Sequence, residues 1–230
     1  MIRVLLVEDD AEVAEVIRFY LEQDGGYDVI WENCAESAEK RIGEPFDVML
    51  LDIMLPGMDG MEFCQKFRER NYCPILFISC IDEEEVMIRA LELGGDDYLV
   101  KPFSNGMLSA RIKANLRRAR MPLDQKDRPR LCGFGKWTLD VTRHEISDGE
   151  KTFRLNPTEH RLLLFFIDHP GQRFTTSSIY ELVWGKPSYG DVRTVMVHVC
   201  NLRKKIEADP NQPRYLRSAR GEGYYFQPEG

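Results

Sequence analysis

The chain has 230 residues, of which 43% are hydrophobic and 30% charged, and its formal net charge is −7. This length suits two domains of about 100–150 residues each. The six cysteines include no Cys-x-x-Cys pair, so the sequence predicts thiols outside any zinc site or disulfide scaffold. There is no charged-then-apolar leader and no apolar run of about 18 residues, so we expect a cytoplasmic protein without membrane contact.

The charge is divided unevenly between the two halves of the chain. Residues 1–121 hold 14 Lys and Arg against 24 Asp and Glu, a net charge of −10, whereas residues 122–230 hold 17 against 14, a net charge of +3. An acidic half repels nucleic acid and suits a cation site, while a mildly basic half permits contact with a phosphate backbone. We therefore expect the two halves to have different partners.

Apolar segments alternate with helical patterns through residues 1–120. We expect strands near 2–7, 27–31, 47–51, 75–79 and 97–100, and helices near 11–24, 35–43, 60–70, 84–93 and 105–119. Regular alternation of strand and helix indicates a parallel sheet with helices on both faces, and unbroken apolar runs indicate strands covered on both sides. The predicted fold class of this domain is α/β, a doubly wound parallel sheet of five βα units.

A different pattern begins after residue 120. Residues 121–130 contain two prolines and dense charge with little to bury, which indicates an interdomain linker. We then expect an antiparallel sheet over 131–155, helices near 158–168, 176–183 and 191–208, and a hairpin of 215–218 with 224–227. The order of sheet, three helices and hairpin predicts an α+β winged helix-turn-helix domain over 131–230.

Polar side chains follow four strands of the first domain. Glu8 and Asp9 come after the first strand, Asp52 after the third, Ser79 ends the fourth, and Lys101 follows the fifth. The carboxyl ends of parallel strands meet at one edge of a sheet, so we expect these groups to share a pocket. Clustered carboxylates repel one another unless a hard cation lies among them, and Mg²⁺ favours oxygen ligands. The pattern predicts a metal-assisted phosphoryl acceptor.

Each role in that chemistry has a candidate residue. Asp52 is the predicted acceptor, with Asp9 and Asp52 as ligands of Mg²⁺ and Glu8 or Asp10 acting through water. Lys101 and Ser79 are expected to hold the phosphoryl oxygens. For Asp10 alone, the alternative that it merely caps the following helix stays open.

These motifs carry a resemblance to a known family. The matching stretches are Val7-Glu8-Asp9-Asp10, Leu51-Asp52-Ile53-Met54-Leu55-Pro56-Gly57, Gly60, Ser79 and Asp96-Asp97-Tyr98-Leu99-Val100-Lys101-Pro102-Phe103. Residues 1–120 resemble a receiver domain, and the whole chain resembles a response regulator of the OmpR/PhoB family. The resemblance implies a bacterial two-component transcription regulator whose Asp52 is phosphorylated by a sensor histidine kinase. It implies no enzyme activity beyond assisting phosphotransfer and dephosphorylation of the chain itself.

The resemblance also implies finer roles in the pocket. The Met54 carbonyl would be a further metal ligand, the peptide before Pro102 would be cis, and Tyr98 would be a rotamer switch responding to Ser79. Apolar Met54 and Ile81, two residues after the acceptor and the hydroxyl, cannot orient an attacking water, so we expect a long-lived phosphoryl state.

Two positions of the first domain depart from the family pattern. Cys80 replaces a small alanine, and we expect it to narrow access to the acceptor. Gly95 is expected to loosen the turn before Asp96.

The third helix of the second domain carries a regular apolar pattern. Val195, Val199, Leu202 and Ile206 recur at spacings of four, three and four, which predicts one buried face. Away from that face we place Thr194, Val197, His198, Asn201 and Lys205. Such side chains suit the major groove, where asparagine pairs with adenine, but a plainly solvated face is the alternative.

The resemblance supplies DNA-binding positions for this second domain. It implies contacts to double-stranded promoter DNA from Arg193, Thr194, His198, Arg203 and Arg220, and the groove-facing side of the helix adds Val197 and Asn201. Cys200 and Asn201 stand where some members carry basic residues, so we expect a different base preference. The loop over 184–190 resembles a segment that touches RNA polymerase, with a plain connection as the alternative.

The resemblance further implies a homodimer through the fourth helix, fifth strand and fifth helix of the receiver domain. Ion pairs near Asp97–Arg111 and Glu92–Lys113 would cross between subunits. The expected interface residues are Met87, Ile88, Leu91, Glu92, Asp97, Met107, Ala110, Arg111 and Lys113. Met87 and Met107 stand where many members carry a basic residue and a glutamate. Apolar contact in place of that ion pair predicts dimerisation that is less sensitive to salt and partly independent of phosphorylation.

Three other functions are alternatives to this interpretation. A phosphohydrolase with an aspartate nucleophile needs a second carboxylate two residues later, where this chain has Met54. A flavodoxin-like nucleotide binder needs backbone amides that receive phosphate, and the acidic residues at 8–10 repel an anion. A receiver that binds only protein, without DNA binding, stays open.

Overall fold

A computed structural model describes residues 1–23, 25–120, 131–185 and 192–229. The chain separates into two compact units, Met1–Ala119 and Arg120–Gly230, here called the N-terminal and C-terminal units. The expected linker at 121–130 lies outside the described residues. None of the described helices is both long and apolar enough to cross a bilayer.

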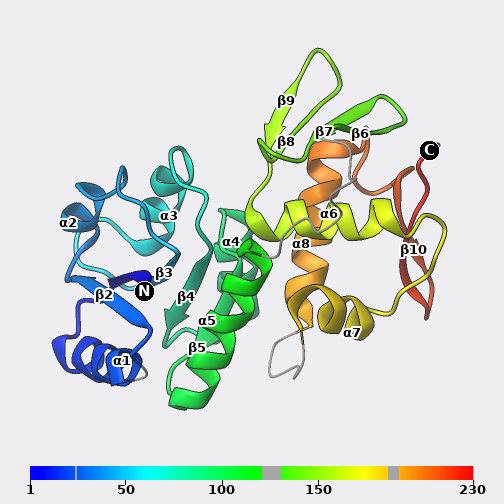
Figure 1. Ribbon diagram of the computed structural model, residues 1–230. Helices are drawn as coiled ribbons and strands as arrows, with labels where there is room; N and C mark the ends of the chain where they lie inside the picture. Colours follow the sequence, from blue (N-terminus) through cyan, green and yellow to red (C-terminus); the bar gives the residue numbers. More distant parts are fainter. Residues whose placement is uncertain (24, 121–130, 186–191, 230) are drawn as a thin grey trace. The chain divides into compact units, whose positions relative to one another are not determined.

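The N-terminal unit is built on a parallel sheet of five strands in the order β2-β1-β3-β4-β5 (Figure 1). The strands are β1 (Ile2–Val7), β2 (Tyr27–Glu32), β3 (Val48–Leu51), β4 (Ile75–Ser79) and β5 (Asp97–Val100). The helices are α1 (Ala11–Gln23), α2 (Ala35–Glu39), α3 (Gly60–Arg68), α4 (Glu84–Glu92) and α5 (Asn105–Arg120). The α/β fold class and the order of these elements confirm the prediction.

Successive strand residues point to opposite sides of this sheet, so the unbroken apolar strands give it two apolar faces. Helices cover both of these faces. On one face, alternate residues of β1, β3 and β4 pack with the buried residues of α1 and α5 in a single core cluster. The other face holds the remaining strand residues, and α2, α3 and α4 carry buried residues of their own. Residues 4–7 and 48–51 are fully buried, which explains their unbroken apolar runs.

One expected helix is shorter than its sequence pattern. Helix α2 was expected to reach residue 43 but ends at Glu39. Beyond that point the backbone makes tighter three-residue bonds, from Lys40 N–H to the Ser37 carbonyl (3.3 Å) and from Ile42 N–H to the Glu39 carbonyl (3.2 Å). These bonds turn the chain before Gly43 and close the helix.

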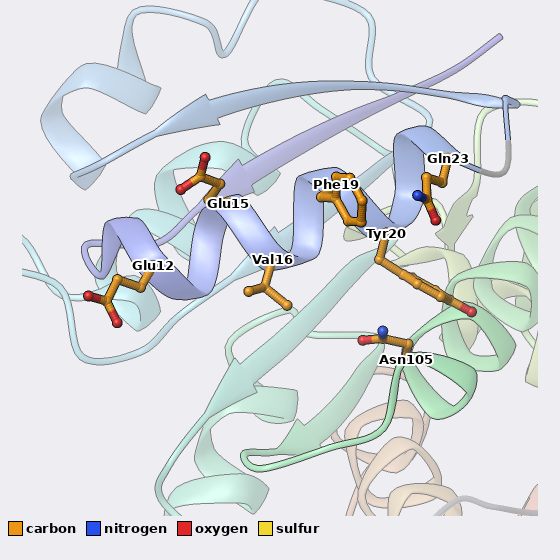
Figure 2. Close-up of a pocket in the computed structure, with 7 residues that line it drawn as sticks. All are labelled: Glu12, Glu15, Val16, Phe19, Tyr20, Gln23 and Asn105. Carbon is orange, nitrogen blue, oxygen red and sulfur yellow. The ribbon is translucent and has the colours of Figure 1, made fainter.

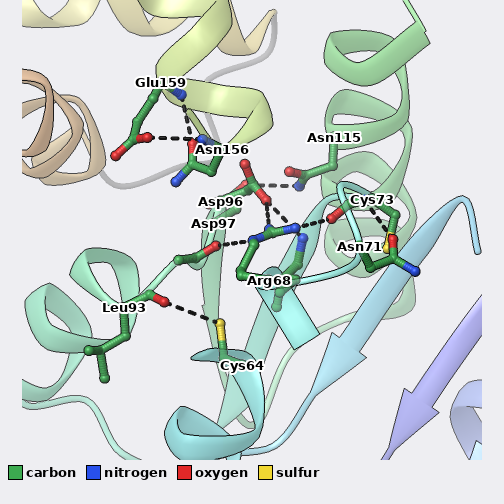
Figure 3. Close-up of polar contacts among 12 residues, drawn as sticks. Cys64, Arg68, Asn71, Cys73, Leu93, Asp96, Asp97, Asn115, Asn156 and Glu159 are labelled. Atoms are coloured by element: carbon green, nitrogen blue, oxygen red, sulfur yellow. Dashed lines mark hydrogen bonds and ion pairs between the residues drawn. The ribbon is translucent and has the colours of Figure 1, made fainter. Parts of the chain in front are cut away.

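A half-buried arginine ties three segments of the N-terminal unit together (Figure 3). The Arg68 guanidinium pairs with Asp96 and donates to the carbonyls of Gly94 (2.9 Å) and Cys73 (2.5 Å). Asp96 also accepts from the Ile75 N–H (2.9 Å), at the start of β4. The end of α3, the start of β4 and the turn into β5 are therefore held by one charge pair, which is satisfied by several hydrogen bonds.

The turn into β5 corrects one expectation. Gly95 was expected to loosen it, but a Cβ at Gly95 would lie 2.8 Å from two carbons of the Phe77 ring and 3.1 Å from the Ala90 carbonyl. Glycine is required there by close packing. The Phe77 ring occupies the space that a side chain at position 95 would need, so the turn is tight where looseness was expected.

The C-terminal unit begins with an antiparallel sheet in the order β6-β7-β8-β9. Its elements are β6 (Leu131–Phe134), β7 (Trp137–Asp140), β8 (Glu145–Ser147), β9 (Thr152–Arg154), α6 (Pro157–Asp168), α7 (Thr176–Ile179), the π-helical η1 (Tyr180–Trp184), α8 (Arg193–Ile206), β10 (Leu216–Ala219) and β11 (Gly223–Phe226). One core cluster joins the sheet, the helices and the β10–β11 hairpin. This order confirms the predicted winged helix-turn-helix.

Two helix boundaries in this unit have clear physical causes. Asn156 and Glu159 form a capping box that starts α6. Helix α8 stops at Ile206 because the buried Glu207 carboxylate accepts three backbone N–H groups, from Arg214 (2.8 Å), Tyr215 (2.9 Å) and Leu216 (2.8 Å). This side chain fixes where the chain turns from α8 into the hairpin.

Candidate functional site

Three carboxylates gather at one edge of the N-terminal sheet. Glu8 and Asp9 follow β1 and Asp52 follows β3, and one oxygen of each lies within 4.8 Å of the others. Glu8 and Asp52 are only 1% and 5% exposed, while Asp9 is exposed. Oxygen ligands this close, with one side open to solvent, fit a hard cation such as Mg²⁺.

Lys101 completes this pocket from the end of β5. Its Nζ lies 2.5 Å from Asp52 Oδ2 and 2.6 Å from Glu8 Oε2. Its backbone N–H donates to the Ser79 carbonyl (2.8 Å), and its peptide with Pro102 is cis, as the family resemblance implies. Burial lowers the pKa of Lys101, but the hydrogen bonds to Asp52 and Glu8 outweigh it and raise the pKa above its ordinary value.

Burial also governs the acidic partner of this lysine. It raises the pKa of Glu8 from 4.5 to about 7, although the hydrogen bond from Lys101 opposes that shift. The backbone of Glu8 is held on both sides, since its N–H donates to the Glu32 carbonyl (3.1 Å) and its carbonyl accepts from the Trp31 indole (2.8 Å). The Glu8 residue is therefore held at its carboxyl group by the Lys101 ammonium and at its backbone by β2.

Two hydroxyl-bearing residues belong to β4 and β5: Ser79 ends β4, and Tyr98 is the second residue of β5. Ser79 is fully buried, and its Oγ accepts from the Ile81 N–H at 3.5 Å. The Tyr98 hydroxyl donates to the Ile81 carbonyl at 2.7 Å, and burial raises the pKa of Tyr98 to about 12. Both side chains therefore meet the same short segment after β4.

The structure separates the remaining acidic and apolar candidates near the acceptor. Asp10 Oδ1 accepts from the N–H groups of Glu12 (2.9 Å) and Val13 (3.2 Å), so it caps α1. The Met54 N–H donates to Asp52 Oδ1 (3.0 Å), while its side chain is 61% exposed. The Cys80 thiol is exposed.

Gly60 sets the distance between α3 and the acceptor. A Cβ at this position would lie 1.9 Å from the Asp52 carbonyl oxygen, so only glycine permits the approach. The Gly60 N–H also donates to the Ile53 carbonyl (2.9 Å). The first residue of α3 therefore packs directly against the loop that carries Asp52.

A surface hollow that the sequence analysis did not anticipate lies along α1 (Figure 2). It measures about 490 Å³ and is lined by Glu12, Glu15, Val16, Phe19, Tyr20, Gln23 and Asn105. Val16 and Phe19 are 59% and 64% exposed. The buried residues of α1 are Ala14, Ile17 and Leu21, which form one apolar face of the helix. Val16 and Phe19 lie outside that face, and two large apolar residues in such positions are a sequence signal for an exposed apolar patch.

The residues expected at the dimer face differ in how exposed they are. Met87 is 5% exposed and Leu91 is fully buried, whereas Ile88 and Met107 are half-buried. Asp97 pairs with Arg111 of the same chain at 2.7 Å. The pairing of these two residues between subunits stays a prediction, as do the roles of the other interface residues.

Helix α8 carries both its predicted apolar face and the positions expected to read DNA. Its core residues are buried as predicted, but Thr194, Val197, His198 and Asn201 are also at most 6% exposed. Within the same unit, the His198 ring lies 5.8 Å from the ring of the buried Trp184. The exposed side chains along α8 and its N-cap are Val192, Met196, Cys200 and Lys204. Base contacts by the buried residues stay predictions.

The arginines of the C-terminal unit divide into two kinds. Arg203 donates to the Leu216 carbonyl (2.8 Å) and Ser218 Oγ (2.8 Å), and burial lowers the pKa of Arg203. It therefore anchors the hairpin to α8, a role that the sequence analysis did not assign. Arg217 and Arg220 are exposed on the hairpin. Arg217 was missed, although the alternation in β10, with Leu216 buried, places it outward.

Two further predicted positions have different outcomes. Arg193 begins α8 and is half-buried, and its predicted DNA contact is untested. The loop over 184–190 resembles a segment that touches RNA polymerase. Its first residue, Trp184, is buried, and residues 186–191 lie outside the described part of the chain.

The pocket and the winged helix define a class of protein in which an aspartate receives a phosphoryl group and a second unit acts on DNA: the response regulators. Residues 4–113 match the family described as response regulator receiver domain, and residues 149–226 match that described as transcriptional regulatory protein, C terminal.

Similar proteins extend along nearly the whole chain. The uncharacterized transcriptional regulatory protein YrkP of Bacillus subtilis (strain 168) is 37% identical over 227 residues, covering 97% of each chain. The phosphate regulon transcriptional regulatory protein PhoB of Escherichia coli (strain K12) is 38% identical over 228 residues, also covering 97% of each. The solved response regulator DrrB, a Thermotoga maritima OmpR/PhoB homolog, is 30% identical and covers 99% of both chains with a TM-score of 0.52. The chain belongs to the OmpR/PhoB family of response regulators, and it is a phosphorylation-dependent DNA-binding transcription regulator.

Proposed function

We propose that Asp52 accepts a phosphoryl group from a histidine of a sensor kinase. The carrying observation is that Lys101 Nζ and the carboxylates of Glu8 and Asp9 gather around Asp52 at the sheet edge. In the transfer, the bond between phosphorus and the kinase histidine nitrogen breaks and a bond to an Asp52 carboxylate oxygen forms. The chain assists only its own phosphotransfer and dephosphorylation.

Each pocket residue has a role in this proposal. Asp9, Asp52 and the Met54 carbonyl would hold Mg²⁺, with Glu8 acting through water, and the ion would offset the charge of the phosphoryl oxygens. Lys101 moves its ammonium from the free carboxylate to a phosphoryl oxygen, and Ser79 donates its hydroxyl to another. Tyr98 then follows Ser79 and transmits the change to the segment after β4.

The test is phosphorylation of the full chain by a small phosphodonor with and without Mg²⁺. We expect label in the wild type only with Mg²⁺, none in Asp52→Asn, and strong loss in Asp9→Asn. Asp10→Asn is the matched control, because Asp10 caps α1 and an asparagine can keep that cap. Undiminished label in Asp52→Asn would overturn the proposal.

The hollow along α1 supports a docking place for the kinase. Helix α1 starts two residues after Asp9, so a partner that delivers phosphate to the pocket can lie along it. Exposed Val16 and Phe19 offer apolar contact, flanked by acidic Glu12 and Glu15 (Figure 2). We expect Phe19→Ala to slow phosphotransfer from the kinase but not from a small donor. Leu131→Ala, which removes a similarly exposed apolar side chain from the other unit, should change neither.

In the proposed output, phosphorylated chains form a homodimer through the α4–β5–α5 face and bind tandem half-sites of promoter DNA. The exposed Arg217 and Arg220 support contact between the β10–β11 hairpin and the DNA backbone. Contact with RNA polymerase and a cytoplasmic location belong to the same proposal.

A further inference from the structure

The indole of Trp31 reaches from β2 to the end of β1. Trp31 pairs with Leu6 in the parallel register. Its Nε1–H donates to the carbonyl of Glu8, two residues after Leu6 in the chain, at 2.8 Å. The next residue of β2, Glu32, accepts the Glu8 N–H through its own carbonyl at 3.1 Å. Both backbone polar groups of Glu8 are therefore held by β2, although β1 itself ends at Val7.

This hydrogen bond acts on more than one residue. The Glu8 carbonyl and the Asp9 N–H belong to one planar peptide group, so holding the carbonyl fixes the plane from which Asp9 departs. The side chains on either side of that peptide are two of the three carboxylates that lie within 4.8 Å of one another. The Glu8 side chain is separately held by Lys101 at 2.6 Å.

The indole is itself well placed to hold this peptide. Trp31 is half-buried and packs against the core cluster that β1 shares with α1 and α5. A phenylalanine at position 31 would keep most of that apolar packing and lose only the N–H donor. The position therefore allows packing and hydrogen bonding to be separated.

We propose that Trp31 is a positioning residue for the cation site, which orients Glu8 and Asp9 through the carbonyl between them. The inference rests on the proposed function of the pocket as a Mg²⁺-dependent phosphoacceptor. Residues that hold metal ligands in place commonly change metal affinity when they are altered. A single neutral hydrogen bond of this kind corresponds to about a 3- to 10-fold change in affinity.

The experiment measures Mg²⁺ binding to the unphosphorylated full chain by titration calorimetry, together with the Mg²⁺ concentration that half-saturates phosphorylation by a small donor. We expect Trp31→Phe to raise the dissociation constant of Mg²⁺ and the half-saturating Mg²⁺ concentration by about 3- to 10-fold each. The phosphorylation rate at saturating Mg²⁺ should stay that of the wild type. The matched control is Trp137→Phe, which removes a similar bond from an indole to the Ile206 carbonyl (2.8 Å) in the C-terminal unit. That control should leave both Mg²⁺ measurements unchanged.

The outcomes separate this inference from the proposed function. A wild type that binds no Mg²⁺ would overturn both. Mg²⁺ binding in the wild type that is equally tight in Trp31→Phe would overturn the positioning role alone. Should Trp31→Phe fail to fold, benzothienylalanine at position 31 keeps the shape of tryptophan without its N–H donor. Wild-type Mg²⁺ affinity in that variant would equally overturn the inference.

Discussion

At the scale of single residues, the pocket places a carboxyl group with a raised pKa beside a lysine. Burial raises the pKa of Glu8 from 4.5 to about 7 against the opposing hydrogen bond from Lys101. Between those two pH values the folded chain keeps a proton that the unfolded chain has released. The contribution of Glu8 to folding is therefore fully present below pH 4.5 and is lost as the pH rises to about 7.

This sign gives a prediction for metal removal. In EDTA, we expect the free energy of unfolding of the wild type to fall between pH 5 and 7 relative to that of Glu8→Gln, which cannot titrate there. Mg²⁺ should reduce the fall, because it binds the folded chain and favours ionised carboxylates. Urea unfolding at several pH values measures it, with Glu12→Gln on exposed α1 as the control. Parallel pH profiles for wild type and Glu8→Gln would contradict the prediction.

Residue types and spacing predicted much of this pocket, but not all of it. Strand-end acids, a serine and a lysine point to one sheet edge in any parallel sheet, so Glu8, Asp52 and Lys101 could be placed together before any coordinates. Trp31 could not be placed, because its role depends on register with a neighbouring strand. The need for glycine at position 95 depends on the Phe77 ring from another layer, which no local pattern reveals.

At the scale of elements, the boundaries that the sequence predicted well are those with local causes. Apolar runs and capping side chains act within a few residues, so strands and most helices lie close to their predicted ranges. The helix expected at 176–183 instead divides into α7 and the π-helical η1, where Tyr180 and Trp184 stack at 5.4 Å. Its wider turn depends on tertiary packing around Trp184, which periodicity does not encode.

The end of α8 offers a test of one such tertiary contact. Glu207→Ala leaves three backbone N–H groups without their carboxylate, so we expect the free energy of unfolding of the C-terminal unit to fall by about 2–4 kcal/mol. Urea unfolding followed by circular dichroism measures it. Glu222→Ala is the control, because that exposed glutamate forms a surface ion pair with exposed Arg173, and its loss should change the free energy by about 0–1 kcal/mol. Similar losses in both variants would contradict the assignment.

The hairpin gives a second prediction at this scale. Arg217→Ala and Arg220→Ala should each weaken DNA binding on most sequences and lower the slope of log affinity against log salt by about 1, since each removes one phosphate contact. Fluorescence anisotropy at two or more salt concentrations measures both effects. Arg70→Ala, an exposed arginine of the N-terminal unit, is the control. A change in base preference without a change in salt slope would instead indicate base reading.

At the scale of the whole molecule, one chain combines an acidic unit that receives phosphate with a basic unit that binds DNA. Residues 1–121 carry a net charge of −10 and residues 122–230 a net charge of +3. The acidic unit disfavours DNA by charge alone, so tight binding calls for two basic units acting together. Dimerisation through the receiver provides that pairing in the proposed function.

We therefore expect phosphorylation to raise affinity for DNA with two tandem half-sites by about 10-fold or more, and affinity for a single half-site very little. Binding titrations with and without a small phosphodonor measure this difference. Asp52→Asn should show no gain on either DNA. An equal gain on the single half-site would show that phosphorylation acts within one chain and not through pairing.

The tight fit between Gly95 and Phe77 restricts the paths by which this sequence can diverge. Alanine at position 95 would place its Cβ 2.8 Å from the Phe77 ring, so that change alone displaces the ring at a cost of about 1–3 kcal/mol. A smaller residue at position 77 first opens the space that the alanine then fills. The two substitutions are therefore tolerated in one order and opposed in the other. We expect the two positions to covary among related sequences: a large side chain at position 77 should occur with glycine at 95, and alanine at 95 should occur with a smaller residue at 77.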